Sequence, residues 1–137
     1  MSVLFEHVGV PVSSIEKSKK LYCGLMGFQV FCEITPQLAV YSKIAFLEKN
    51  GVRIELMEMK GDGWTPMLQG RIAGMVHFAL KTDNLLKEHK KWKDAGYVEK
   101  ILPNCPNVAI PGEEDWWMCY FFGPDGESIE LRGPKGE

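Results

Sequence analysis

The sequence predicts an α+β protein made of two copies of one module, in which a strand and a helix precede three further strands. The hairpin-like segment 46–56 matches segment 121–131 without a gap, and both have turn-forming residues between apolar runs. Before each hairpin, a strand with a histidine is followed by a helix-like stretch and a glycine. Self-similarity on this scale is typical of packed supersecondary units that share a core.

The first module, residues 1–60, begins with an apolar strand over residues 3–12. Ser13 and Glu16 have capping-box spacing, so a helix follows, and Gly27 ends it. A strand over residues 28–34 stops at Pro36, and the remaining strands, 39–47 and 52–59, form the first hairpin.

The second module, residues 73–137, repeats this order after a turn-rich linker, 61–72, within one domain spanning 1–137. A strand over residues 74–81 precedes a helix that Asp83 caps and Gly96 ends. The remaining predicted elements are a strand at 97–102, a long loop at 103–115 that is a candidate lid, and strands at 116–122 and 127–132.

Composition excludes several classes of protein. The 137 residues are 45% hydrophobic and 25% charged, as in ordinary globular domains. A formal net charge of −2 and the lack of a basic run predict no nucleic-acid partner. No apolar run approaches the roughly 20 residues of a membrane span, and Met1-Ser2 does not open a signal peptide. Four cysteines without a Cys-x-x-Cys pair predict reduced thiols in a cytoplasmic protein.

Four residues at equivalent points of the two modules carry the candidate chemistry: His7, Glu55, His77 and Glu130. Any one of them alone is more simply interpreted as a hydrogen-bonded strand histidine or an edge charge. In register within a duplicated module, two imidazoles and two carboxylates form a nitrogen–oxygen set suited to Zn²⁺, Ni²⁺, Co²⁺, Mn²⁺ or Fe²⁺. The sequence therefore predicts one divalent ion per chain, with open positions for water or substrate.

Further residues are candidates for substrate binding. Because strand residues alternate faces, Arg53, Met57 and Met59 share the face of Glu55. Arg53 and Arg132 lie two positions from the two carboxylates and are candidates for an anionic substrate group. The methionines suit either an apolar cavity or the core. Of the adjacent tryptophans, which face opposite ways, Trp117 is the candidate pocket wall.

From about His7 to Glu130 the chain resembles the vicinal oxygen chelate superfamily, which includes glyoxalase I, methylmalonyl-CoA epimerase, fosfomycin-resistance proteins, extradiol dioxygenases and bleomycin-resistance proteins. The Pro-Asp-Gly turn followed by Ile-Glu-Leu is the most specific local match. The resemblance implies paired βαβββ modules whose curled mixed sheets surround a metal cleft. It also implies the metal ligands, which are His7, Glu55, His77 and Glu130.

A carboxylate at the second ligand position makes the chain most similar to glyoxalase I. The resemblance implies a metal-dependent lyase or isomerase that moves a proton next to a carbonyl of a small molecule chelated through vicinal oxygens. It implies Glu130 as the base and Glu55 as the second catalytic carboxylate. The alternatives are an extradiol-type dioxygenase and a metal-free binding or resistance protein of the same fold.

The chain departs from specific members of the superfamily. Glyoxalase I has an arginine for the glutathione carboxylate where this chain has Pro11, and an asparagine where it has Met59. The epimerases carry an extra glutamate where this chain has Ala39. The metal-site residues therefore match the superfamily, while the substrate-recognition residues of these two members do not, and the involvement of glutathione or coenzyme A stays open. Small members commonly pair, so we expect a homodimer with contacts through strands 3–12 and 75–80.

Overall fold

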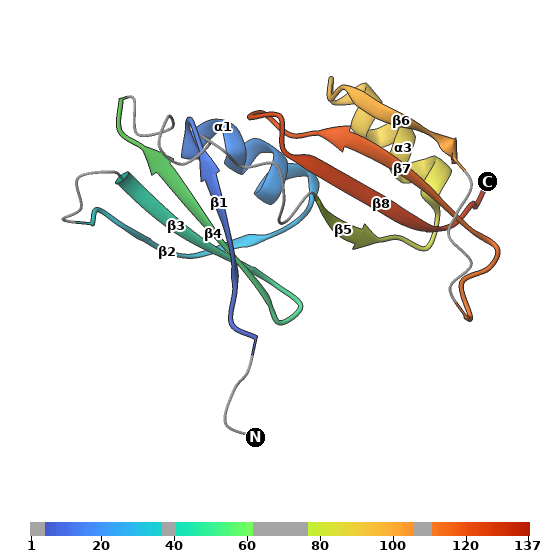
Figure 1. Ribbon diagram of the computed structural model, residues 1–137, viewed down its shortest axis with the longest axis horizontal. Coiled ribbons are helices and arrows are strands. Elements are labelled where there is room, and N and C mark those ends of the chain that lie inside the picture. Colours follow the sequence, from blue (N-terminus) through green and yellow to red (C-terminus); the bar gives the residue numbers. More distant parts are fainter. Residues whose placement is uncertain (1–4, 37–40, 62–76, 106–110) are drawn as a thin grey trace, which may run out of the picture. The chain divides into compact units, whose positions relative to one another are not determined.

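The computed structural model describes residues 5–36, 41–61, 77–105 and 111–137, and the chain divides into two compact units, Met1–Ile72 and Ala73–Glu137 (Figure 1). Apart from Gly61, the predicted linker lies outside the described residues. Among the described helices, none has the length and apolar character needed to cross a membrane.

The first unit is one four-stranded mixed sheet with a helical segment on one face. Its sheet order is β1-β4-β3-β2, and β1 runs parallel to β4 while the other neighbours are antiparallel. The elements in chain order are β1 (Val8–Val12), α1 (Ile15–Lys19), the π-helical η1 (Lys20–Leu25), β2 (Gln29–Ile34), β3 (Tyr41–Lys49) and β4 (Val52–Met59).

Alternation along β4 separates the core of this unit from its other face. Ile54 and Leu56 are buried beneath α1, where Ile15 is also buried. Glu58 lies on the same face and accepts a hydrogen bond from the Ile15 backbone N–H at 2.8 Å, which satisfies a free donor at the helix start. Ser14, not the expected Ser13, is the N-cap residue. The odd-numbered residues of β4 lie on the face away from α1.

The second unit repeats the topology, with sheet order β5-β8-β7-β6 and β5 parallel to β8. This confirms the predicted α+β class with two mixed sheets. β6 extends to Cys105 and so occupies the start of the expected lid loop, and Asn84 rather than Asp83 caps the helix. The elements are β5 (His77–Lys81), α3 (Leu85–Asp94), β6 (Glu99–Cys105), β7 (Trp116–Phe122) and β8 (Ser128–Pro134).

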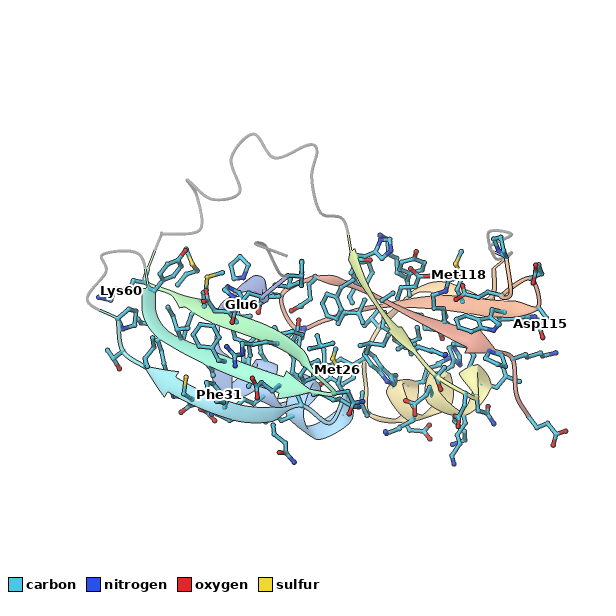
Figure 2. All side chains as sticks on the ribbon, turned by 90° about the horizontal axis from the view of Figure 1, so that it is seen from below. Glu6, Met26, Phe31, Lys60, Asp115 and Met118 are labelled. Atoms are coloured by element: carbon cyan, nitrogen blue, oxygen red, sulfur yellow. The ribbon has the colours of Figure 1, made fainter. Side chains whose placement is uncertain are left out.

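The core of the second unit lies between α3 and one face of its sheet. Trp92 is 1% exposed and packs on Phe121, with the ring centroids 5.4 Å apart. Ile129 and Leu131 of β8 are buried on the same face. The next residues along the strands point the other way, and Figure 2 shows Met118 of β7 on the side of the sheet away from α3.

The two central hairpins differ in their loops. Asn50 and Gly51, both with positive φ (50° and 79°), alone join β3 to β4, as in a tight type I′ turn. In the second hairpin Phe122 pairs with Ser128, so residues 123–127 form the loop. The ungapped match of residues 46–56 with residues 121–131 therefore aligns β4 correctly with β8. It aligns β3 with β7 one residue out of register.

Candidate functional site

In the first unit, His7 and Glu55 come together on the face of the sheet away from α1. His7 Nε2 lies 3.5 Å from Glu55 Oε2. The parallel register pairs Gly9 with Glu55, and His7 precedes Gly9 by two residues and thus shares its face. Gly9 carries no side chain, and the methyl group of Met57 lies 3.0 Å from where its Cβ would be. The flexible thioether of Met57, and not a side chain of β1, therefore fills the space beside the Glu55 carboxylate.

In the second unit, His77 and Glu130 form the equivalent pair. His77 Nε2 lies 2.9 Å from Glu130 Oε2. The register again pairs the residue two positions after the histidine, here Ala79, with the glutamate. Glu130 is 5% exposed, which makes it one of the few buried charged residues in the described part of the chain. Each unit thus brings together one histidine and one glutamate of the four predicted ligands.

An aromatic ring supports each histidine. The Phe46 ring meets His7 edge-on at 5.6 Å, and the Tyr120 ring meets His77 edge-on at 5.2 Å. Tyr120 also donates a hydrogen bond from its hydroxyl to Glu130 Oε2 at 3.1 Å. Sequence reasoning missed both residues. A correct strand register would have identified them, because Phe46 lies directly opposite Glu55 and Tyr120 directly opposite Glu130.

Glu6 is a further contact that the sequence reasoning missed. One oxygen of its carboxylate contacts His7 Nδ1, and the other accepts a hydrogen bond from Arg53 Nη1 at 2.7 Å. The pKa of Glu6 is lowered chiefly by His7, and Arg53 adds to the effect. Metal-binding histidines usually donate the N–H of their other ring nitrogen to a carboxylate or carbonyl. His7 has this arrangement, with Nε2 towards Glu55.

The two predicted anion-binding arginines are already paired. Besides Glu6, Arg53 contacts Glu48, to which its Nε donates at 2.9 Å. Arg132 Nη2 donates to Glu113 Oε2 at 2.8 Å. An anionic substrate group would therefore have to displace a carboxylate partner to bind either guanidinium.

The apolar candidates differ in burial and in the face on which they lie. Met57 lies on the face of Glu55, and alternation along β4 places Met59 on the same face, where it is only 6% exposed. Trp117 pairs with Gly133 and shares the face of the buried Cys119, so the register places Trp116 rather than Trp117 on the face of Glu130. Adjacent strand residues face opposite ways, so the prediction of Trp117 as the pocket wall is wrong on this register.

The donor atoms fit a divalent ion. Two atoms bound to one ion at about 2.1 Å lie about 3.0 Å apart at a right angle and about 3.4 Å apart at the tetrahedral angle. The measured separations of 2.9 Å and 3.5 Å match adjacent coordination positions. Among the described residues, no three His, Cys, Asp or Glu side chains gather closely enough to hold a metal. The four-ligand site remains a prediction.

Three solved structures with different functions share the fold. The trypanothione-dependent glyoxalase I of Leishmania major is 18% identical with a TM-score of 0.71, covering 98% of this chain and 88% of that one. The fosfomycin resistance protein FosX of Listeria monocytogenes, complexed with Mn(II) and sulfate, is 18% identical with a TM-score of 0.68, covering 97% and 93%. TnmS3, an antibiotic binding protein from Streptomyces sp. CB03234, is 22% identical with a TM-score of 0.68, covering 98% of each chain.

The family assignment follows from the sequence over nearly its whole length. No curated protein matches the chain. A family model does match, over residues 4–131, and this span includes both His–Glu pairs. The chain belongs to the glyoxalase/bleomycin resistance protein/dioxygenase superfamily.

Proposed function

We propose that this protein is a metal-dependent lyase or isomerase that moves a proton next to a carbonyl of a small-molecule substrate. The observation that carries the proposal is the recurrence of the same His Nε2–Glu Oε2 pairing at equivalent positions of both units. One such pair alone is an ordinary structural contact, whereas its repetition supports a common role. The similarity to a glyoxalase I and to a manganese-bound FosX supports the same reading.

In this proposal, His7, Glu55, His77 and Glu130 hold one divalent ion, which is Zn²⁺, Ni²⁺, Co²⁺, Mn²⁺ or Fe²⁺. The two pairs come from one chain or from two chains of a homodimer. When bound, the ion would supply Lewis-acid polarisation of the substrate carbonyl, which makes the neighbouring C–H bond more acidic. The pair separations and the contact of Glu6 with His7 support this assignment.

The carboxylates of the chain carry the proton. Glu130 is the proposed base, because a buried carboxylate has few waters competing for its oxygens. Glu55 is the proposed second carboxylate, which acts on the opposite face of the substrate or returns the proton to it. Arg53 and Arg132 lie two residues from these carboxylates and are proposed to meet anionic substrate groups by exchanging their present carboxylate partners.

The test is Glu130→Gln, which keeps an oxygen ligand but removes the base. We expect this variant to retain metal. It should lose exchange of the α-proton with deuterated solvent, measured by NMR on pyruvate and on a hemithioacetal of methylglyoxal with a small thiol. Undiminished exchange in the variant would exclude Glu130 as the base. Oxygen consumption with these or catechol substrates would instead favour the dioxygenase alternative.

A second candidate is metal-free binding of a small molecule. His77 Nε2 and Glu130 Oε2 already lie within hydrogen-bond distance, and Tyr120 donates to the same carboxylate, so this pair needs no ion to satisfy it. TnmS3, a solved structure of this fold, is an antibiotic binding protein. Metal analysis of protein purified without chelator separates the two candidates, because a protein without metal supports the binding function.

We also propose a homodimer. Within the described part of the first unit, Phe5, Phe31 and Ile34 are large apolar side chains that are exposed, and Phe5 belongs to the predicted contact strand. Burial of such side chains against a second copy would stabilise the pair. Light scattering at micromolar concentration tests this, and a monomeric mass would rule it out.

A further inference from the structure

The two His–Glu pairs are alike in register but unlike in what holds the carboxylate. Glu130 Oε2 accepts a hydrogen bond from the Tyr120 hydroxyl at 3.1 Å. The residue opposite Glu55 is Phe46, which has the same edge-on contact with its histidine but no hydroxyl. The two pairs therefore differ by one group: both have an aromatic ring against the histidine, but only the ring of Tyr120 carries a hydroxyl.

The hydroxyl restrains the rotation of the Glu130 carboxylate. Within the described residues, the contacts of this carboxylate with Tyr120 and with His77 are both made by Oε2. When one oxygen of a carboxylate is held, the direction of the other oxygen is also fixed. A hydroxyl that donates to a charged acceptor makes a stronger bond than one between neutral groups. The carboxylate is thus held with Oε2 towards His77, and Oε1 is the oxygen left to take a proton.

We propose that Tyr120 is a positioning residue for Glu130, holding Oε2 beside His77 as a metal ligand and presenting Oε1 to the substrate. The inference rests on the proposed function, since it assigns a role within the same site. It also makes the two carboxylates unequal, because Glu55 has no corresponding donor at Phe46. Contacts to a ligand from outside the coordination sphere commonly change metal affinity 10- to 100-fold when they are removed.

The first experiment measures metal affinity. Tyr120→Phe removes the hydroxyl and keeps the ring against His77, so it isolates the hydrogen bond from the packing. We expect the dissociation constant for Mn²⁺ and Zn²⁺, measured by competition with a chromophoric chelator, to rise about 10- to 100-fold. The matched control is Tyr97→Phe, which removes a hydroxyl from a tyrosine packed on Trp92 instead. The control should bind metal like the parent, and both variants should keep its circular dichroism.

The reciprocal variant is Phe46→Tyr, which offers Glu55 the donor that Glu130 already has. It should bind metal at least as tightly as the parent. A loss of affinity in Phe46→Tyr equal to the loss in Tyr120→Phe would show that any change beside these histidines disturbs the site, and it would overturn the positioning role.

A second experiment uses the metal-free protein. The chain has four tyrosines, and their ring Cζ resonances are resolved by selective ¹³C labelling. Tyr120→Phe identifies the Tyr120 signal by its disappearance. Glu130→Gln replaces a charged acceptor with a neutral one, so it should shift this signal and leave that of Tyr97 in place. An unshifted Tyr120 signal would mean that the hydrogen bond is absent and would overturn the inference.

The outcomes separate the two proposals. A parent protein that binds no divalent metal overturns the proposed function, and the inference with it. A parent that binds metal while Tyr120→Phe binds it within twofold overturns the inference alone. Weaker binding in Tyr120→Phe, with Tyr97→Phe unchanged and the Tyr120 signal responsive to Glu130→Gln, supports both.

Discussion

Phe46 lies directly opposite Glu55 across the β3–β4 ladder and turns the edge of its ring to His7. Tyr120 has the same relationship to Glu130 and His77 in the second unit. In both units, a three-residue arrangement is set by three neighbouring strands of the same sheet. Strand register therefore places the candidate site residues, because it fixes which side chains share a face and a level.

The histidines provide the first prediction. His77→Ala should lower the metal content of purified protein severely, because it removes one of the four proposed ligands, while the fold is retained. His89→Ala is the matched control, since His89 is also next to a carboxylate, with Nε2 2.8 Å from Glu99 Oε2, but it lies on α3. Elemental analysis of both variants gives the answer. Wild-type metal content in His77→Ala would mean that the ion binds elsewhere.

Sequence periodicity was sufficient for the order of the elements along the chain and for the equivalent positions of the two histidines and the two glutamates. Both follow from the alternation of faces along a strand and from the duplication. The residues opposite the glutamates depend on loop length, which the ungapped match did not reveal. Tyr120 was missed for this reason, since the match aligns Phe46 with Phe121.

Contacts between side chains were less predictable than strand register. Arg53 was a candidate for an anionic ligand, yet it is held by Glu6 and Glu48. Glu6 precedes the first strand, so its reach to Arg53 depends on the path of the chain before β1. Pattern reasoning carries no information about that path. The choice between Trp116 and Trp117 likewise required the actual register of β7 against β8.

Trp92 should be the most costly side chain to remove from the second unit. It is 1% exposed and packs on Phe121 and Tyr97, so its loss leaves a cavity. Trp92→Ala should lower the free energy of unfolding by about 3–5 kcal/mol. Urea titration followed by circular dichroism measures this. Lys90→Ala, at a side chain 76% exposed on the same helix, should change stability by no more than about 0.5 kcal/mol. Equal losses in the two variants would contradict the assigned core.

The cysteines should differ in reactivity. Burial raises the pKa of the Cys119 thiol to about 12, and the nearby Glu99 and Glu130 carboxylates act in the same direction. Since the thiolate is the reactive form, Cys119 should resist iodoacetamide at pH 8 in the folded protein. Cys32 is only partly buried and should be labelled. Mass spectrometry of the digested protein, with urea-unfolded protein as the reference, tests this. If Cys119 were labelled as fast as Cys32, its side chain would not be buried in the folded protein.

The last prediction concerns acid stability and the Glu99 carboxylate, which joins β6 to α3. Its oxygens lie 2.8 Å from His89 Nε2 and 3.0 Å from Lys93 Nζ. Burial raises the pKa of Glu99, but His89 and Lys93 together lower it further, so in the folded protein it lies below the ordinary value of 4.5. A carboxyl whose pKa is lowered by folding takes up its proton first in the unfolded chain. Its contribution to stability is therefore complete above about pH 5 and is lost as the pH falls through the folded pKa.

Glu99→Gln should remove this contribution, which we place at about 1 kcal/mol because Lys93 is largely exposed. The parent and the variant should differ in free energy of unfolding at pH 7 and converge as the pH falls towards 3. Glu88→Gln is the control, since Glu88 lies on α3 and its carboxylate is at the longer distance of 3.9 Å from Lys91 Nζ. Urea titrations at pH 7, 5, 4 and 3 give the comparison. If the difference in free energy of unfolding between parent and Glu99→Gln stays constant across this range, the protonation of Glu99 is not linked to folding. The loss of its contacts with His89 and Lys93 would then not explain the lower stability in acid.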